Sequence, residues 1–239
     1  MLTLRATFFY IGLTLVTILI VAFSPLFFPF PQKVRSRYIS LWAYSVLWWL
    51  KITCNLGFRV EGIENIPQGN GLILAKHQSA WETIALQTIF PAQTWVLKRS
   101  LLWIPIFGWG LALTRPIAID RTAGKKALKQ VIKQGIARLQ QELWIVIFPE
   151  GTRTTPGQHK RYAIGGAMLA EKSGFPVVPV CHNAGEFWPK QGFVKHSGEI
   201  TLVIGESFDP AGMKAGEINT RVEEWIESTY KRITTHHTK

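Results

Sequence analysis

The chain has 239 residues, a formal net charge of +12 and ten tryptophans. This length suffices for one sizeable domain with an appendage. Basic proteins bind nucleic acids, anionic membrane surfaces or anionic small molecules. The sequence shows no recognition helix, zinc-finger spacing or aromatic RNA-binding motif, which argues against nucleic acid. Because Trp favours the membrane interface and Lys and Arg favour anionic lipid, the composition indicates a membrane surface.

The two cysteines, Cys54 and Cys181, lie far apart in different sequence contexts. This arrangement predicts neither a disulfide framework nor a metal cluster. We therefore expect a reducing compartment and no metal site.

The first part of the chain is strongly apolar. Residues 6–32 contain no charged residue, and a helix is predicted over residues 8–23. A second apolar segment runs from Tyr38 to Leu56, and the basic segment 33–37 separates the two. A transmembrane hairpin would place this basic loop outside, against the positive-inside tendency. Two interpretations remain for residues 1–56: a single membrane span, which we favour, or a two-helix element that dips into one leaflet. Both leave the rest of the chain on the cytoplasmic side.

From residue 57 onward, short apolar runs alternate with stretches of helical periodicity. The helical stripe is clearest near the C-terminus, where Ile218, Val222 and Ile226 share one face. Such alternation predicts an α/β domain over residues 57–239, with a mostly parallel mixed sheet flanked by helices. Strands are predicted at 58–61, 72–75, 95–97, 117–119, 143–148, 177–180 and 200–204, and helices at 79–88, 123–142, 164–173 and 217–233.

A histidine and an acid follow the strand predicted at residues 72–75. His77 precedes Glu82 by five positions. If His77 lies in the loop and Glu82 in the first helical turn, the carboxylate can reach back to one ring nitrogen and leave the other to accept a proton. A simpler explanation is a capping box between Ser79 and Glu82. His77 and Glu82 are therefore a candidate catalytic pair, with the capping box as the alternative.

A second polar segment, residues 148–153, follows the strand predicted at residues 143–148. Pro149 ends the strand, Gly151 permits an unusual backbone, and Glu150 and Arg153 place opposite charges around the turn. A tight turn closed by a surface ion pair is the simpler explanation. It does not account for an acid and a base at the edge that His77 occupies, which is where ligands bind in open α/β sheets.

Two further strand ends are basic. Lys98 and Arg99 follow the strand predicted at 95–97, and Arg121 follows the strand predicted at 117–119. Arginine offers a planar fork to phosphate oxygens, and lysine a point charge. Snorkelling at a membrane surface explains Lys98 and Arg99 equally well. For Arg121 we favour ligand binding.

Four ordered blocks together resemble the glycerolipid acyltransferase family. They are His77 with Glu82, the run Ile117–Arg121, the run Phe148–Arg153 and the run Val177–Val180. The resemblance covers about residues 57–204, and its third block is the most specific. A hydrophobic N-terminal element is also common in this family.

The resemblance implies an enzyme at the cytoplasmic face of the inner (plasma) membrane. It would move a fatty acyl group from acyl-CoA or acyl carrier protein to the sn-2 hydroxyl of lysophosphatidic acid, forming phosphatidic acid without a covalent acyl-enzyme, metal or cofactor. His77 would be the general base, and Glu82 would orient it. The anionic substrate and an anionic bilayer suit the basic charge of the chain. The residues that would bind the glycerol phosphate are Lys98, Arg121, Glu150, Gly151, Thr152 and Arg153.

Two alternatives and three departures accompany this resemblance. The acceptor could instead be glycerol 3-phosphate, a lyso-ornithine lipid or another lysophospholipid, or the chain could be a non-catalytic membrane lipid-binding protein. A serine hydrolase is disfavoured because the sequence has no Gly-x-Ser-x-Gly elbow. The departures are Lys76 where the family commonly has Asn, Glu82 where it commonly has Asp, and Ala163 where a Lys is frequent. The first two leave the chemistry intact, and the third weakens any substrate contact from that loop.

Overall fold

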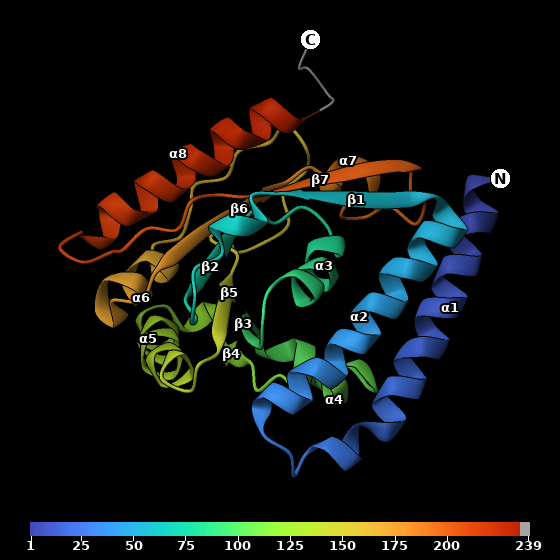
Figure 1. Ribbon diagram of the computed structural model, residues 1–239, viewed down its shortest axis with the longest axis horizontal. Helices are drawn as coiled ribbons and strands as arrows, with labels where there is room; N and C mark the ends of the chain where they lie inside the picture. Colours follow the sequence, from blue (N-terminus) through green and yellow to red (C-terminus); the bar gives the residue numbers. More distant parts are fainter. Residues whose placement is uncertain (235–239) are drawn as a thin grey trace.

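A seven-stranded sheet forms the centre of the protein (Figure 1). The computed structural model describes residues 1–234, without the side chain of Arg121. The strand order is β1-β7-β6-β2-β5-β3-β4, and every neighbouring pair is parallel except β6 with β7. The prediction of a mostly parallel mixed sheet is confirmed. The strands are β1 (Leu56–Glu61), β2 (Leu72–Ala75), β3 (Gln93–Lys98), β4 (Ile117–Ile119), β5 (Trp144–Ile147), β6 (Val177–His182) and β7 (Gly198–Ile204).

Helices cover both faces of the sheet, which gives a three-layer α/β architecture (Figure 1). One apolar cluster joins the first face to α1, α2 and α3 and includes Phe9, Leu50 and Trp81. A second joins the opposite face to α5, α6 and α8 and includes Leu169 and Ile226. The helices are α1 (Leu2–Phe23), α2 (Gln32–Cys54), α3 (Trp81–Ile89), α4 (Phe107–Ala112), α5 (Lys125–Leu139), α6 (Gly165–Ser173), α7 (Ala184–Phe187) and α8 (Ala215–Ile233).

Two of the differences from the helices predicted from the sequence have a clear physical cause. The helix expected over 123–142 is shorter, because Gly124 has a φ of 47° and turns the chain just before α5 begins at Lys125. The short helix α4 was not predicted, since two of its six residues are glycines, which disfavour helix interiors. Its Gly110 packs so closely on α1 that an added Cβ would lie 2.9 Å from Val21. Tertiary packing therefore holds α4 in place.

The N-terminal helices α1 and α2 lie side by side and run in opposite directions (Figure 1). Of the described helices, α1 with the turn after it, Leu2–Phe27, is long and apolar enough to cross a membrane; its mean hydropathy is 2.3. Helix α2 is more polar and packs on α3, where Ser40 donates a hydrogen bond to the carbonyl of Gln87 and Tyr44 to that of Thr88. The N-terminal pair is thus attached directly to the α/β layer.

Candidate active site

His77 lies in the loop between β2 and α3. Its Nδ1 is 2.8 Å from Oε1 of Glu82, and its ring stacks on that of Phe148 with centroids 4.0 Å apart. The His77 side chain is 13% exposed, whereas that of Glu82 is fully buried. With Glu82 ionised, Nδ1 carries the hydrogen of this bond, which leaves Nε2 to accept a proton. This geometry is the one expected of a base and its orienting acid.

Glu82 also holds the loop before α3 in place by accepting hydrogen bonds from backbone amides. Its Oε1 accepts hydrogen bonds from the N–H groups of Gln78 (3.0 Å) and Ser79 (2.9 Å), which precede the N-cap of α3 at Ala80. Only half of the capping box expected between Ser79 and Glu82 forms, because Oγ of Ser79 accepts the N–H of Trp81 and not that of Glu82. The carboxylate thus holds the loop before α3 and also contacts His77. Burial alone would raise the pKa of Glu82, but nearby His182 and the hydrogen bonds from His77 and Ser79 hold it below its ordinary value.

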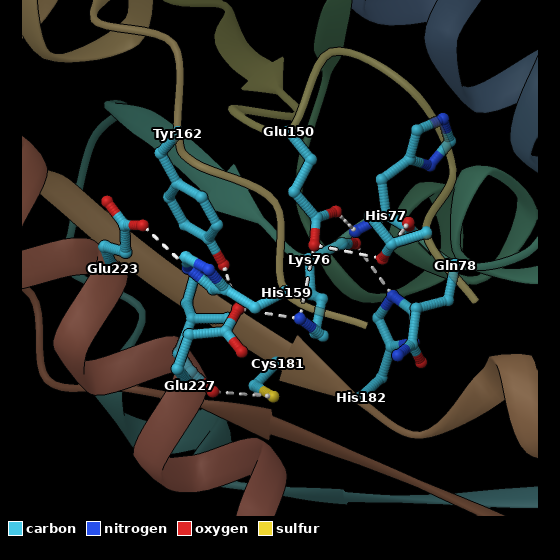
Figure 2. Close-up of polar contacts among 12 residues, drawn as sticks. Lys76, His77, Gln78, Glu150, His159, Tyr162, Cys181, His182, Glu223 and Glu227 are labelled. Carbon is cyan, nitrogen blue, oxygen red and sulfur yellow. Dashed lines mark hydrogen bonds and ion pairs between the residues drawn. The ribbon is translucent and has the colours of Figure 1, made fainter. Parts of the chain in front are cut away.

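The carboxylate of Glu150 lies inside the protein, against Lys76 and the backbone of His77 (Figure 2). It lies 3.2 Å from Nζ of Lys76, accepts the backbone N–H of His77 at 2.6 Å and accepts the hydroxyl of Thr154 at 3.1 Å. The alternative of a surface ion pair between Glu150 and Arg153 is therefore wrong. Because Glu150 is buried and both its oxygens are engaged, its placement favours support of the His77 loop over direct substrate contact.

A cavity of about 310 Å³ adjoins His77. Its wall includes Lys98 and Arg153, two of the predicted phosphate ligands, together with Phe148. Helices α1, α2 and α4 supply much of the remaining lining, which is mainly apolar and includes Ile20, Val21, Ile39, Trp42, Phe107 and Leu111. A base, two cations and an apolar wall thus meet in one space.

The remaining predicted ligands are Gly151, Thr152 and Arg121. Gly151 and Thr152 belong to the turn between Glu150 and Arg153, and Gly151 has a φ of 69° that favours glycine. Arg121 begins the turn after β4, the strand paired with β3, at whose end Lys98 lies; the side chain of Arg121 is outside the described part of the structure. Arg99 is not part of the cavity wall.

Sequence reasoning did not predict the buried polar layer behind His77. Lys76 pairs with Glu227 of α8 as well as with Glu150, and Nε2 of His182 donates a hydrogen bond to the carbonyl of Lys76 (Figure 2). The only sequence signal was the unusual Lys76 itself. No group of three or more potential metal ligands occurs within residues 1–234.

The site combines a histidine oriented by a carboxylate with an apolar cavity that two cations line. Enzymes that remove a proton from the hydroxyl of an anionic amphiphile form the class suited to such a site. The chain belongs to the acyltransferase family, whose model, described as Acyltransferase, matches residues 57–183. The family expected from the four sequence blocks is therefore confirmed.

Curated relatives and a solved structure agree with this membership. The chain is 44% identical over 207 residues to a 1-acyl-sn-glycerol-3-phosphate acyltransferase of Pseudomonas aeruginosa, covering 85% of this chain and 80% of the relative. It is 28% identical to the enzyme of that name from Saccharomyces cerevisiae, covering 84% and 69%. The crystal structure of the 1-acyl-sn-glycerophosphate (LPA) acyltransferase PlsC from Thermotoga maritima superimposes with a TM-score of 0.82 at 24% identity, covering 99% of this chain and 97% of that one. This last likeness supports the fold.

Proposed function

We propose that the protein transfers a fatty acyl group from an acyl thioester to the sn-2 hydroxyl of 1-acyl-sn-glycerol 3-phosphate, forming phosphatidic acid. The observation that carries this proposal is the His77–Glu82 pair on the wall of an apolar cavity shared with Lys98 and Arg153. The 44% identical relative, which carries the corresponding name, supports the same acceptor.

The proposed chemistry uses the two nitrogens of the His77 ring. Nε2 takes the proton of the sn-2 hydroxyl while the oxygen attacks the thioester carbonyl, and Glu82 stabilises the resulting imidazolium through Nδ1. The tetrahedral intermediate then collapses, the carbon–sulfur bond breaks, and the imidazolium returns its proton to the departing thiolate. The donor is acyl-CoA or acyl carrier protein, and every protein atom ends as it began.

We expect the phosphate of the acceptor to bind at the cationic side chains. Arg153 and Lys98, together with Arg121, bind the phosphate and hold the hydroxyl beside His77; Gly151 and Thr152 shape the turn that carries Arg153. The apolar lining from α1, α2 and α4 accommodates acyl chain. The polar and apolar portions of one lysophospholipid thus match the two kinds of wall.

The N-terminal element, residues 1–56, places this cavity at the bilayer, and residues 57–239 form the catalytic domain on its cytoplasmic face. Helix α1 exposes many large apolar side chains and is about 33 Å long, from its 22 residues. Both of its ends contact the rest of the chain, through the Phe9–Trp188 ring pair and the Val21–Gly110 contact. A helix held at both ends fits the interpretation of a two-helix element in one leaflet better than a full span.

The test is release of free thiol from acyl-CoA by the purified full-length protein in mixed micelles. Acceptors would be lysophosphatidic acid, glycerol 3-phosphate, a lyso-ornithine lipid, lysophosphatidylcholine and none. We expect turnover with lysophosphatidic acid and phosphatidic acid as product. Turnover with another acceptor alone would reassign the substrate, and absence of acceptor-dependent release with either acyl-CoA or acyl carrier protein would indicate a lipid-binding protein.

His77→Ala provides the matched catalytic test. General-base catalysis contributes roughly 10²–10⁴-fold to rate, so we expect kcat to fall by that order while the thermal unfolding transition persists. Substantial remaining turnover in the folded variant would remove His77 from the role of base.

A further inference from the structure

Lys76 is a buried lysine one position before the proposed base. Its side chain is 1% exposed, and its Nζ lies 3.2 Å from Oε1 of Glu150 and 2.8 Å from Oε1 of Glu227 (Figure 2). The ammonium also lies 4.9 Å from the centre of the Tyr230 ring. One cation therefore sits between two carboxylates from distant parts of the sequence. We name the cluster of Lys76, Glu150 and Glu227 the buried triad.

The triad is joined directly to the backbone of His77. Oε2 of Glu150 accepts the His77 N–H, while Oε1 faces Lys76. The flanking peptide is fixed as well, because the N–H of Lys76 donates to the carbonyl of Val180 and its carbonyl accepts from Nε2 of His182. Displacing the Glu150 carboxylate would thus displace the backbone that carries the base.

Helix α8 completes the charge balance of the triad. Glu227 is supplied by α8, and its Oε1 also accepts the Tyr162 hydroxyl at 2.9 Å. The other ionisable groups facing the triad are His77, His182, Tyr162, Cys181 and Tyr230. Burial raises the pKa of Tyr162 and of Cys181, so both are neutral near pH 7. With Lys76 protonated and both carboxyl groups ionised, the triad would hold one positive and two negative charges.

Loss of the ammonium would act first on Glu150. Burial already raises the pKa of Glu150 although Lys76 opposes this, and the two carboxylates would repel each other without the cation between them. A protonated Glu150 accepts hydrogen bonds more weakly and would loosen its hold on the His77 amide. In contrast, loss of the Glu227 charge alone would leave the Lys76 ammonium paired only with Glu150, which favours the ionised form of Glu150.

We propose that Lys76 is a positioning residue that keeps Glu150 ionised and thereby fixes the backbone of His77, with Glu227 of α8 as its second counter-ion. This inference rests on the proposed acyl transfer. It also gives a structural role to the departure from asparagine at position 76. Helix α8, which supplies no residue to the cavity wall, is thereby connected to the base.

Steady-state kinetics of the full-length protein across pH 6–9 test this inference, with acyl-CoA and lysophosphatidic acid varied in turn. In Lys76→Met we expect kcat to fall at least tenfold at pH 7, with both KM values within about threefold, because positioning errors act on the reacting geometry. The acid limb of the kcat profile should move to higher pH. In Glu227→Gln, which keeps an acceptor for Lys76 and Tyr162, the acid limb should move to lower pH.

Lys195→Met is the matched control, because Lys195 is also a 1% exposed lysine and lies outside the cavity wall. Its acid limb should coincide with that of the wild type. An unaltered kcat and acid limb in folded Lys76→Met would overturn the inference, as would equal shifts in Lys76→Met and Lys195→Met. If Lys76→Met does not fold, an unchanged or upward-shifted acid limb in Glu227→Gln overturns it and a downward shift supports it. A wild type without acyl transfer would instead overturn the proposed function.

Discussion

Glu150 and Arg153 are three residues apart on one turn but have different surroundings. Glu150 is 2% exposed and bound to Lys76, whereas Arg153 is partly exposed on the cavity wall. A carboxylate in contact with Arg153 would compete with an anionic ligand for the guanidinium. By directing Glu150 inward, the turn leaves the positive charge of Arg153 directed to the cavity. In the proposed site the acid would support the base, and the arginine would bind the phosphate.

Arg153→Ala tests this division of roles. A hydrogen bond to a charged group contributes about 1.5–3 kcal/mol, so we expect the KM for lysophosphatidic acid to rise roughly 10- to 100-fold. The KM for the acyl donor should change little. Arg59→Ala is the control, since it removes the same charge from an exposed side chain of strand β1, outside the cavity wall. Equal kinetic losses for acceptor and donor would contradict the assignment of Arg153 to the phosphate.

The turn after β5 determines where the side chains of Glu150 and Arg153 lie, and Gly151 is the residue of this turn with a positive φ. At a φ of 69°, a side chain strains the backbone even though an added Cβ would meet no atom within 4 Å. The same φ and the same open space occur at Gly174, which caps α6. A residue with a Cβ would therefore meet equivalent backbone strain at the two positions. One position lies beside the proposed site and the other at the end of a helix.

Gly151→Ala and Gly174→Ala form a matched pair. Each should lower the free energy of unfolding by about 1–2 kcal/mol, the cost of a left-handed conformation for a residue with a Cβ. Only Gly151→Ala should reduce kcat/KM, by on the order of tenfold, because it shifts the turn between Glu150 and Arg153. Thermal unfolding and acyl transfer measured on both variants check this. Parallel losses of activity would show that the turn has no special role in the site.

Local sequence signals predicted the elements well where a single segment determines the outcome. The runs before His77 and Phe148 are apolar and short enough to be buried strands, and the loop after β2 brings His77 and Glu82 together over five positions. The direction of Glu150 could not be predicted, because it depends on Lys76 from another strand. The Lys76–Glu227 pair spans 151 positions and forms only when α8 packs on the sheet.

At the scale of the whole molecule, one buried lysine joins helix α1 to the α/β layers. Nζ of Lys195 donates to the carbonyl of Phe193 at 2.7 Å and to the hydroxyl of Tyr10 on α1. It also lies 4.0 Å from the centre of the Tyr10 ring and 4.7 Å from that of Trp188. No carboxylate within residues 1–234 forms an ion pair with it. This aromatic cage therefore holds a lysine without a counter-ion.

The cage predicts an unusual dependence of stability on pH. Burial lowers the pKa of Lys195 from 10.5 to about 8, so between these values the folded protein binds fewer protons than the unfolded chain. The contribution of Lys195 to the free energy of unfolding therefore rises as pH increases from about 8 to 10.5. Lys195→Met lacks this titration. Thermal unfolding in one detergent at pH 7.5 and 9.5 should show the wild type gaining stability relative to the variant. Parallel changes in the two Tm values would contradict the prediction. The expected divergence would show that the folded state disfavours the charge of the lysine that contacts α1.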